Sequence, residues 1–189
     1  MGPASLYYNV IQYIKNMKKN CFILLISCFF ALGFSACSSD DTEWRDSNLA
    51  FFDSLKNREG IHEIGDSVNG YPGLYYEVLK EATGDTIPII GNVVKVTYDG
   101  WLFNDTINYD SKHILLRAEA FDYNDKYQLT VGGDAIEGWN LILQHMPVGA
   151  KWRVYIPYYL GYGSSAQTNV PAYSTLIFDI TLRKIVSQN

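Results

Sequence analysis

Regular hydrophobic patterning begins after residue 43 of the chain. Leu49, Phe52 and Leu55 recur there at the spacing of one helix face, which predicts an amphipathic helix over residues 44–58. Glycines 60 and 65 follow and are expected to end that helix.

From residue 74 onward the apolar positions follow a strand pattern. The segments are short, rich in β-branched and aromatic residues, and partly alternating, which is typical of β-strands. Strands are expected at 74–80, 92–103, 127–131, 151–157 and 174–186. Residues 111–126 show no clear period and are interpreted as a long loop or a frayed short helix.

One short helix interrupts the strands. Trp139, Ile142, Leu143 and Met146 are spaced as one buried face of a helix over about 137–145. Asp134 stands three residues before Glu137, which resembles a capping box at the helix start. Several antiparallel strands with one short helix against one face, preceded by a helical appendage, predict an α+β fold.

The first 37 residues have the pattern of an export signal. Lysines 15, 18 and 19 precede an apolar run over 21–37 that ends in small residues, and Met17 begins such a signal more naturally than Met1. The stretch Phe-Ser-Ala-Cys ending at Cys37 resembles a bacterial lipobox, whose cysteine is lipidated. Two interpretations stay open: a lipoprotein anchored to the outer membrane, facing either the periplasm or the surface, or an ordinary cleaved signal with an incidental thiol.

The length of 189 residues fits one domain with appendages. We expect a leader over 1–37, a linker and N-terminal helix over 38–72, and a domain over 73–189. All three cysteines lie at or before residue 37, so this domain has no disulfide, thiolate zinc site or cysteine nucleophile. The three histidines lie far apart and share no metal-binding spacing.

Charge narrows the set of partners. The part after Cys37 carries 12 basic and 20 acidic residues, a formal net charge of −8. It has no basic stripe and no aromatic RNA-binding motif, which argues against nucleic-acid binding. The acidity alone is enough to keep an exported protein soluble.

Six motifs occur in a fixed order along residues 92–185. They are VTYDGWL (96–102), NYDS (108–111), GDAIEGW (133–139), MPVGAKW (146–152), IPYYLGYG (156–163) and VPAYSTLIFDITL (170–182). This ordered set resembles the FKBP-type peptidyl-prolyl cis-trans isomerases. The resemblance implies a twisted antiparallel sheet wrapped around one short helix. It also implies rotation of X–Pro peptide bonds in exported proteins, without metal or cofactor.

The resemblance assigns site residues position by position. Trp139 is expected to form the floor under a proline ring, and the backbone N–H of Ile136 and the hydroxyl of Tyr162 to bind substrate carbonyls. Asp110 is expected to form hydrogen bonds at the rim, and Cys37 is the lipidation candidate. The expected walls are Tyr98, Tyr109, Tyr127, Ala135, Ile136, Phe178 and Val170. Expected partners are proline-containing polypeptides, macrolide-type pocket ligands and the membrane.

Four features depart from the family pattern. Ala135 replaces a larger aliphatic residue, Tyr109 and Tyr127 stand where phenylalanine is usual, and the segment 112–126 is longer than the family's connection. A hydroxyl in an apolar pocket needs a partner and weakens binding of an apolar ring. These features favour an alternative function, a catalytically weak peptide-binding or chaperone lipoprotein. A third alternative is a surface lipoprotein that binds another ligand through its aromatic face.

Overall fold

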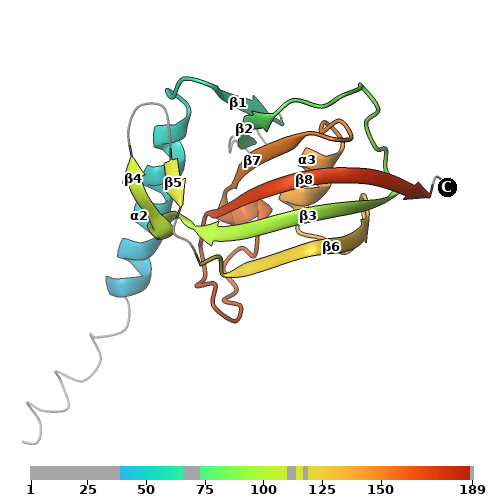
Figure 1. Cartoon of the computed structure of the whole chain (residues 1–189). Helices are drawn as coiled ribbons and strands as arrows, with labels where there is room; N and C mark the ends of the chain where they lie inside the picture. The colour runs from blue at the N-terminus through green and yellow to red at the C-terminus, as the bar shows by residue number, and fades with distance from the viewer. Residues whose placement is uncertain (1–38, 66–72, 110–113, 117–118, 188–189) are drawn as a thin grey trace, which may run out of the picture. The chain divides into compact units, whose positions relative to one another are not determined.

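The computed structural model describes residues 39–65, 73–109, 114–116 and 119–187. Residues Glu43–Asn189 form one compact unit. Its main element is a six-stranded antiparallel sheet with the order β1-β2-β7-β8-β3-β6 (Figure 1). The strands are β1 (Ile61–Ile64), β2 (Leu74–Lys80), β3 (Val93–Leu102), β6 (Asp122–Thr130), β7 (Lys151–Ile156) and β8 (Leu176–Ser187).

Alternation along the strands separates the side chains into two faces. In β3 every second residue is buried up to position 100, so Val94, Val96 and Tyr98 point to one face. The helix α3 (Glu137–Leu143) packs on that face through Ile142 and Leu143, which are fully buried. The larger core of the protein therefore lies between α3 and the sheet.

The other face carries a second, smaller core. The helix α2 (Ser39–Leu55) contributes Phe52 and Leu55, which are buried against the aromatic and aliphatic residues of four strands. Those strand residues are Tyr75, Trp101, Tyr155 and Ile177. The predicted amphipathic helix is thus part of the compact unit, packed on the sheet through Phe52 and Leu55, two of the three residues that predicted it.

Two short strands and two short 3₁₀ helices complete the described elements. The strands β4 (Thr106–Tyr109) and β5 (Ile114–Leu116) pair with each other as a separate antiparallel hairpin. The 3₁₀ helices are η1 (Phe103–Asp105) and η2 (Tyr158–Leu160). No helix among the described residues is both long and apolar enough to cross a bilayer.

The structure corrects several expectations about local elements. The helix α2 begins at Ser39, inside the expected linker, and ends at Leu55 rather than 58. The segment 111–126 is not a plain loop, because it contains β5 and the first part of β6. The strands β1 and β4 were not predicted. The expected capping box is wrong: the N-cap of α3 is Ile136, without a side-chain cap.

Candidate functional site

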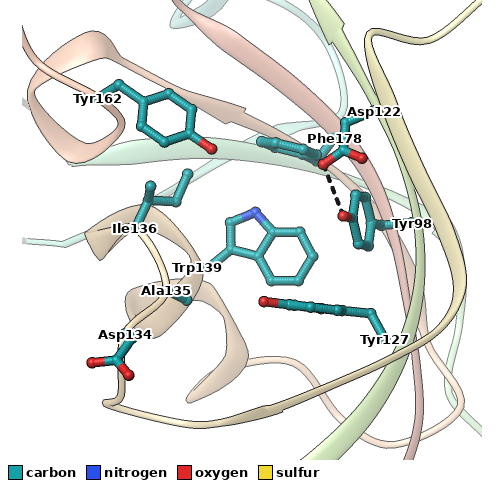
Figure 2. Close-up of a pocket in the computed structure, with 9 residues that line it drawn as sticks. All are labelled: Tyr98, Asp122, Tyr127, Asp134, Ala135, Ile136, Trp139, Tyr162 and Phe178. Atoms are coloured by element: carbon teal, nitrogen blue, oxygen red, sulfur yellow. Dashed lines mark hydrogen bonds between the residues drawn. The ribbon is translucent and has the colours of Figure 1, made fainter. Parts of the chain in front are cut away.

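A pocket of about 210 Å³ opens beside α3 on the larger-core face of the sheet (Figure 2). Its walls come from β3, β6 and β8, from the turn into α3, and from the segment after β7. The lining residues are Tyr98, Asp122, Tyr127, Asp134, Ala135, Ile136, Trp139, Tyr162 and Phe178. The pocket is therefore aromatic, with two carboxylates and three tyrosines.

Three rings surround the indole of Trp139 edge-on. The ring centroids of Tyr98, Phe178 and Tyr127 lie 5.0, 5.4 and 6.1 Å from that of Trp139, at interplanar angles of 87°, 85° and 88°. Such T-shaped pairs are favourable because a ring edge and a ring face carry opposite partial charges. The arrangement makes an aromatic box whose rings stand perpendicular to the indole plane, as Figure 2 shows.

Close approach of α3 to the sheet fixes the position of Trp139. A Cβ atom on Gly138 would lie 2.5 Å from the Cγ2 atom of Ile156 on β7, so a larger residue there would push the helix away. Trp139 itself is 4% exposed. The helix thus holds the indole in place through a contact that only glycine permits.

Asn140 organises the turn that leads into α3. Its Oδ1 accepts a hydrogen bond from the N–H of Gly132 at 2.9 Å, and its Nδ2 donates to the carbonyls of Gly133 and Ala135, both at 3.1 Å. Because Asn140 is buried, these bonds satisfy a side chain that would be costly to leave unpaired. Asn140 therefore fixes the residues immediately before Ile136.

The hydroxyl of Tyr98 donates a hydrogen bond to Oδ2 of Asp122 at 2.8 Å, marked in Figure 2. Burial of the ring raises the pKa of Tyr98 above its ordinary value, and the hydrogen bond to Asp122 and the charge of that carboxylate raise it further. Tyr98 therefore stays neutral and keeps donating to Asp122 well into alkaline solution.

Phe178 reaches the pocket through a gap that a glycine leaves open. A Cβ atom on Gly100 would lie 2.6 Å from Cε1 of Phe178 and 3.2 Å from the ring of Phe121. The rings of Phe121 and Phe178 are themselves in T-shaped contact at 5.8 Å. Phe121, the residue directly before Asp122, thus packs against the Phe178 ring that forms one wall of the pocket.

Tyr162 lies in the segment that follows η2, and its hydroxyl points toward the pocket (Figure 2). Tyr162 is 37% exposed and Tyr127 is 39% exposed, so these two are more accessible than Tyr98, the third tyrosine of the pocket. Partial burial and the nearby charge of Asp122 raise the pKa of Tyr162. The hydroxyl is consequently a neutral hydrogen-bond donor at physiological pH.

The structure brings most of the predicted site residues together. Seven of them line one pocket: Tyr98, Tyr127, Ala135, Ile136, Trp139, Tyr162 and Phe178. Val170 is buried in the larger core and is not among the lining residues. Tyr109 belongs to β4, whose side chains are not described, and Asp110 and Cys37 lie outside the described residues.

Three polar residues of the site were missed from the sequence: Asp122 and Asp134, which line the pocket, and Asn140, which holds the turn into α3. Asp122 follows Phe121 in an aromatic-Asp pair like Tyr109-Asp110, the pair to which the family resemblance assigned the rim position. Asn140 was not singled out, because a polar residue between the apolar positions 139 and 142 gives no local signal of its role. Among the described residues, no group of three histidine, cysteine or acidic side chains is placed to hold a metal ion.

Comparison with known proteins points to one family. The sequence model of the FKBP-type peptidyl-prolyl cis-trans isomerases matches residues 84–183. The FKBP-type 22 kDa peptidyl-prolyl cis-trans isomerase of Escherichia coli is 36% identical over 115 residues, 60% of this chain and 50% of that protein. An FK506-binding protein of Neisseria meningitidis is 34% identical over 115 residues, 60% of this chain and 96% of that protein.

Solved structures agree with the sequence match. A peptidyl-prolyl cis-trans isomerase from Pseudomonas syringae shares 27% identity with a TM-score of 0.61, covering 82% of this chain and 100% of that one. The chain spans only half the length of the Escherichia coli relative, so the match concerns the domain rather than the whole of that protein. The residues matched by the family model include every residue that lines the pocket, and the chain belongs to the FKBP-type peptidyl-prolyl cis-trans isomerase family.

Proposed function

We propose that the protein catalyses cis-trans isomerisation of X–Pro peptide bonds at the pocket around Trp139. The observation that carries this proposal is the aromatic box, in which three rings stand edge-on around one buried indole. Such a site fits a flat, apolar five-membered ring better than a charged or extended group. Membership of the isomerase family supports the same activity.

The reaction needs little more than such a pocket. The barrier to rotation is the resonance of the amide, about 20 kcal/mol, and no covalent bond has to break. Uncatalysed rotation takes tens of seconds or more. A pocket that holds the proline ring and binds the twisted amide more tightly than the planar one lowers this barrier. Neither a nucleophile nor a general acid is required.

Two donors are available for the carbonyls that flank the proline. The N–H of Ile136 belongs to the N-cap of α3, before the hydrogen-bonded ladder of the helix begins. The hydroxyl of Tyr162 points toward the pocket from the same side as Ile136 in Figure 2. We assign Ile136 and Tyr162 to the two carbonyls, with Trp139 beneath the ring.

Asp122 takes the rim position that the sequence assigned to Asp110. Its carboxylate accepts the bond from Tyr98 and lines the pocket. This interaction orients the Tyr98 ring, which is itself one wall of the aromatic box. Asp122 therefore acts as a positioning residue and as a source of negative potential at the pocket rim.

A peptide-binding module with weak catalysis is the second candidate. The hydroxyl of Tyr127 points into the box in Figure 2, where an apolar ring would need to displace its hydration. Ala135 leaves the wall beside Ile136 less filled than a larger aliphatic residue would. Both features favour looser binding of proline, and macrolide-type ligands would meet the same polar group.

The deciding experiment is prolyl isomerisation by the full 189-residue chain on short proline peptides. We expect acceleration well above the uncatalysed rate, lost in Trp139→Leu and reduced in Tyr162→Phe. Tyr123→Phe is the matched control, because Tyr123 is an exposed tyrosine of β6 that does not line the pocket. A folded protein that binds proline peptides without accelerating rotation would establish the second candidate instead.

Export and lipid anchoring belong to the same proposal. The apolar run before Cys37 and the lipobox-like Phe-Ser-Ala-Cys support attachment to the outer membrane through Cys37. Mass spectrometry of the protein from membranes is expected to show cleavage before Cys37 and acyl chains on it. Cys37→Ala is expected to yield an unlipidated protein, and an unmodified wild-type Cys37 would contradict the anchor.

A further inference from the structure

Asn48 connects α2 to the start of β8. It is fully buried, although α2 packs on the smaller-core face of the sheet with its other side exposed to solvent. Its Oδ1 accepts a hydrogen bond from the N–H of Thr175 at 2.6 Å, and its carbonyl accepts one from the hydroxyl of Thr175 at 3.4 Å. Two residues 127 positions apart are therefore joined by bonds that would be costly to leave unmade in the interior.

The residues just before Thr175 are also held from α2. Tyr173 has a φ of 60°, a left-handed conformation that a residue other than glycine keeps only where its surroundings enforce it. The guanidinium of Arg45 on α2 lies 5.5 Å from the centre of the Tyr173 ring, a cation–π contact. The same ring is in T-shaped contact with Tyr158, with ring centroids 5.4 Å apart.

Tyr173 in turn holds the residue next to Tyr162. The N–H of Tyr173 donates to the carbonyl of Gly163 at 2.9 Å, and the N–H of Gly163 donates to the carbonyl of Tyr158 at 2.8 Å. Both hydrogen-bonding groups of Gly163 are thus used within this segment. Because Tyr162 is 37% exposed, its place over the pocket depends on this backbone more than on packing of its ring.

We infer that Arg45 and Asn48 of α2 are positioning residues for the hydroxyl of Tyr162. They hold 173–175 in place, Tyr173 holds Gly163, and Gly163 fixes the backbone that carries Tyr162. The helix on one face of the sheet thereby determines the geometry of the pocket on the other. The catalytic part of this inference rests on the proposed isomerase function, whereas the structural part does not.

Hydrogen exchange in the full chain tests the structural part without any assay of activity. Arg45→Ala and Asn48→Ala are expected to accelerate exchange of the Gly163 and Tyr173 amides at least tenfold. Arg45 is exposed, so its variant will fold even if Asn48→Ala does not. Arg45→Lys keeps a cation over the ring and is expected to restore most of the protection.

Phe52→Ala is the matched control on the same helix. Phe52 packs on Tyr75, with ring centroids 4.8 Å apart, and is not part of the contacts to 173–175. Its loss is expected to accelerate hydrogen exchange of amides throughout the smaller core, with no particular effect on the amides of Gly163 and Tyr173. If Arg45→Ala and Asn48→Ala leave these two amides unchanged, or act only as Phe52→Ala does, the inference is wrong.

A double-mutant cycle with Tyr162→Phe tests the catalytic part. In the wild-type background Tyr162→Phe is expected to lower kcat/KM about tenfold, and in the Arg45→Ala background less than threefold. An equal effect in both backgrounds overturns the link between α2 and the pocket. If the wild-type chain does not isomerise proline peptides, the proposed function fails, while hydrogen exchange still decides the positioning role.

Discussion

Aromatic side chains gather on both faces of the sheet, around Trp139 on the α3 side and around Trp101 on the α2 side. On the α2 side Phe52, Tyr75, Trp101 and Tyr155 are at most 8% exposed. On the α3 side Tyr127 and Tyr162 are 39% and 37% exposed. Composition does not distinguish the two clusters. The two clusters differ in how much of each the packed helix shields from solvent. The 17 residues of α2 bury the rings on their face, whereas the seven residues of α3 leave the aromatic box open.

Replacing one tryptophan on each face is expected to give the largest difference between an effect on activity and an effect on stability. Trp139→Leu is expected to lower kcat/KM roughly 100-fold, about 2.7 kcal/mol, because the ring under the substrate proline is lost. Trp101→Leu removes a ring of the same size from the sealed cluster. It is expected to reduce the free energy of unfolding by roughly 2–4 kcal/mol while leaving the activity of the folded protein nearly unchanged.

Isomerisation assays and chemical denaturation on the same samples check this pair. Loss of activity in folded Trp101→Leu equal to that in Trp139→Leu would show that the two faces are not functionally distinct.

Gly100→Ala should narrow the open cluster from behind. The new methyl group would meet the ring of Phe178 at 2.6 Å and displace it toward the pocket. Overpacking of this kind costs roughly 1–3 kcal/mol of stability, and kcat/KM is expected to fall about tenfold. Gly84→Ala is the control, since a Cβ at Gly84 has nothing within 4 Å. Equal activities of the two variants would contradict the role given to Gly100.

The two acidic candidates for the pocket rim can be distinguished directly. Asp122→Asn is expected to weaken the bond from Tyr98, which costs roughly 1.5 kcal/mol for a bond to a charged acceptor, and to reduce kcat/KM several-fold. Tyr98→Phe is expected to have a similar effect, and the double variant to be little worse than either. Asp110→Asn is expected to leave kcat/KM unchanged. If Asp110→Asn lowers kcat/KM and Asp122→Asn does not, the rim position belongs to Asp110.

The smallest expected effect is that of alkaline pH. The pKa values of Tyr98, Tyr155 and Tyr162 are raised in the folded protein, chiefly by burial. Above about pH 10 the unfolded chain therefore binds fewer protons than the folded one, and stability declines as the pH rises. Activity is expected to stay level from neutral pH to about 9. Denaturation curves and tyrosinate absorbance against pH check both statements, and a stability that rises above pH 10 would contradict them.

Much of the fold and of the pocket could be predicted because local patterns determine them. The strands β2, β3, β7 and β8 and the helix α3 were found nearly at their observed bounds. Trp139, Tyr162 and Phe178 stand in motifs whose order is fixed along the chain. Each of these signals lies within a few residues of the feature that it predicts.

The remaining features depend on pairing between distant segments. Asp110 and Asp122 each follow an aromatic residue, so the sequence offers no local reason to choose between them. The carboxylate of Asp122 reaches Tyr98 because β6 pairs with β3, which places Asp122 opposite Gly100. Likewise, the amphipathic face of α2 was visible, but not that Thr175 would be the partner of Asn48. The four residues of β1 were too few to give a pattern.

The central place of β8 in the sheet has a consequence for biosynthesis. This strand is the last of those that the structure describes, yet it joins β7 to β3 and so connects the two halves of the sheet. A ribosome delivers it after every other described element, and the contact of Asn48 with Thr175 cannot form earlier. Folding of such a non-local topology is slow and cannot complete before β8 has been synthesised. A protein proposed to hasten the folding of others is therefore itself expected to need protection from aggregation until its last strand arrives.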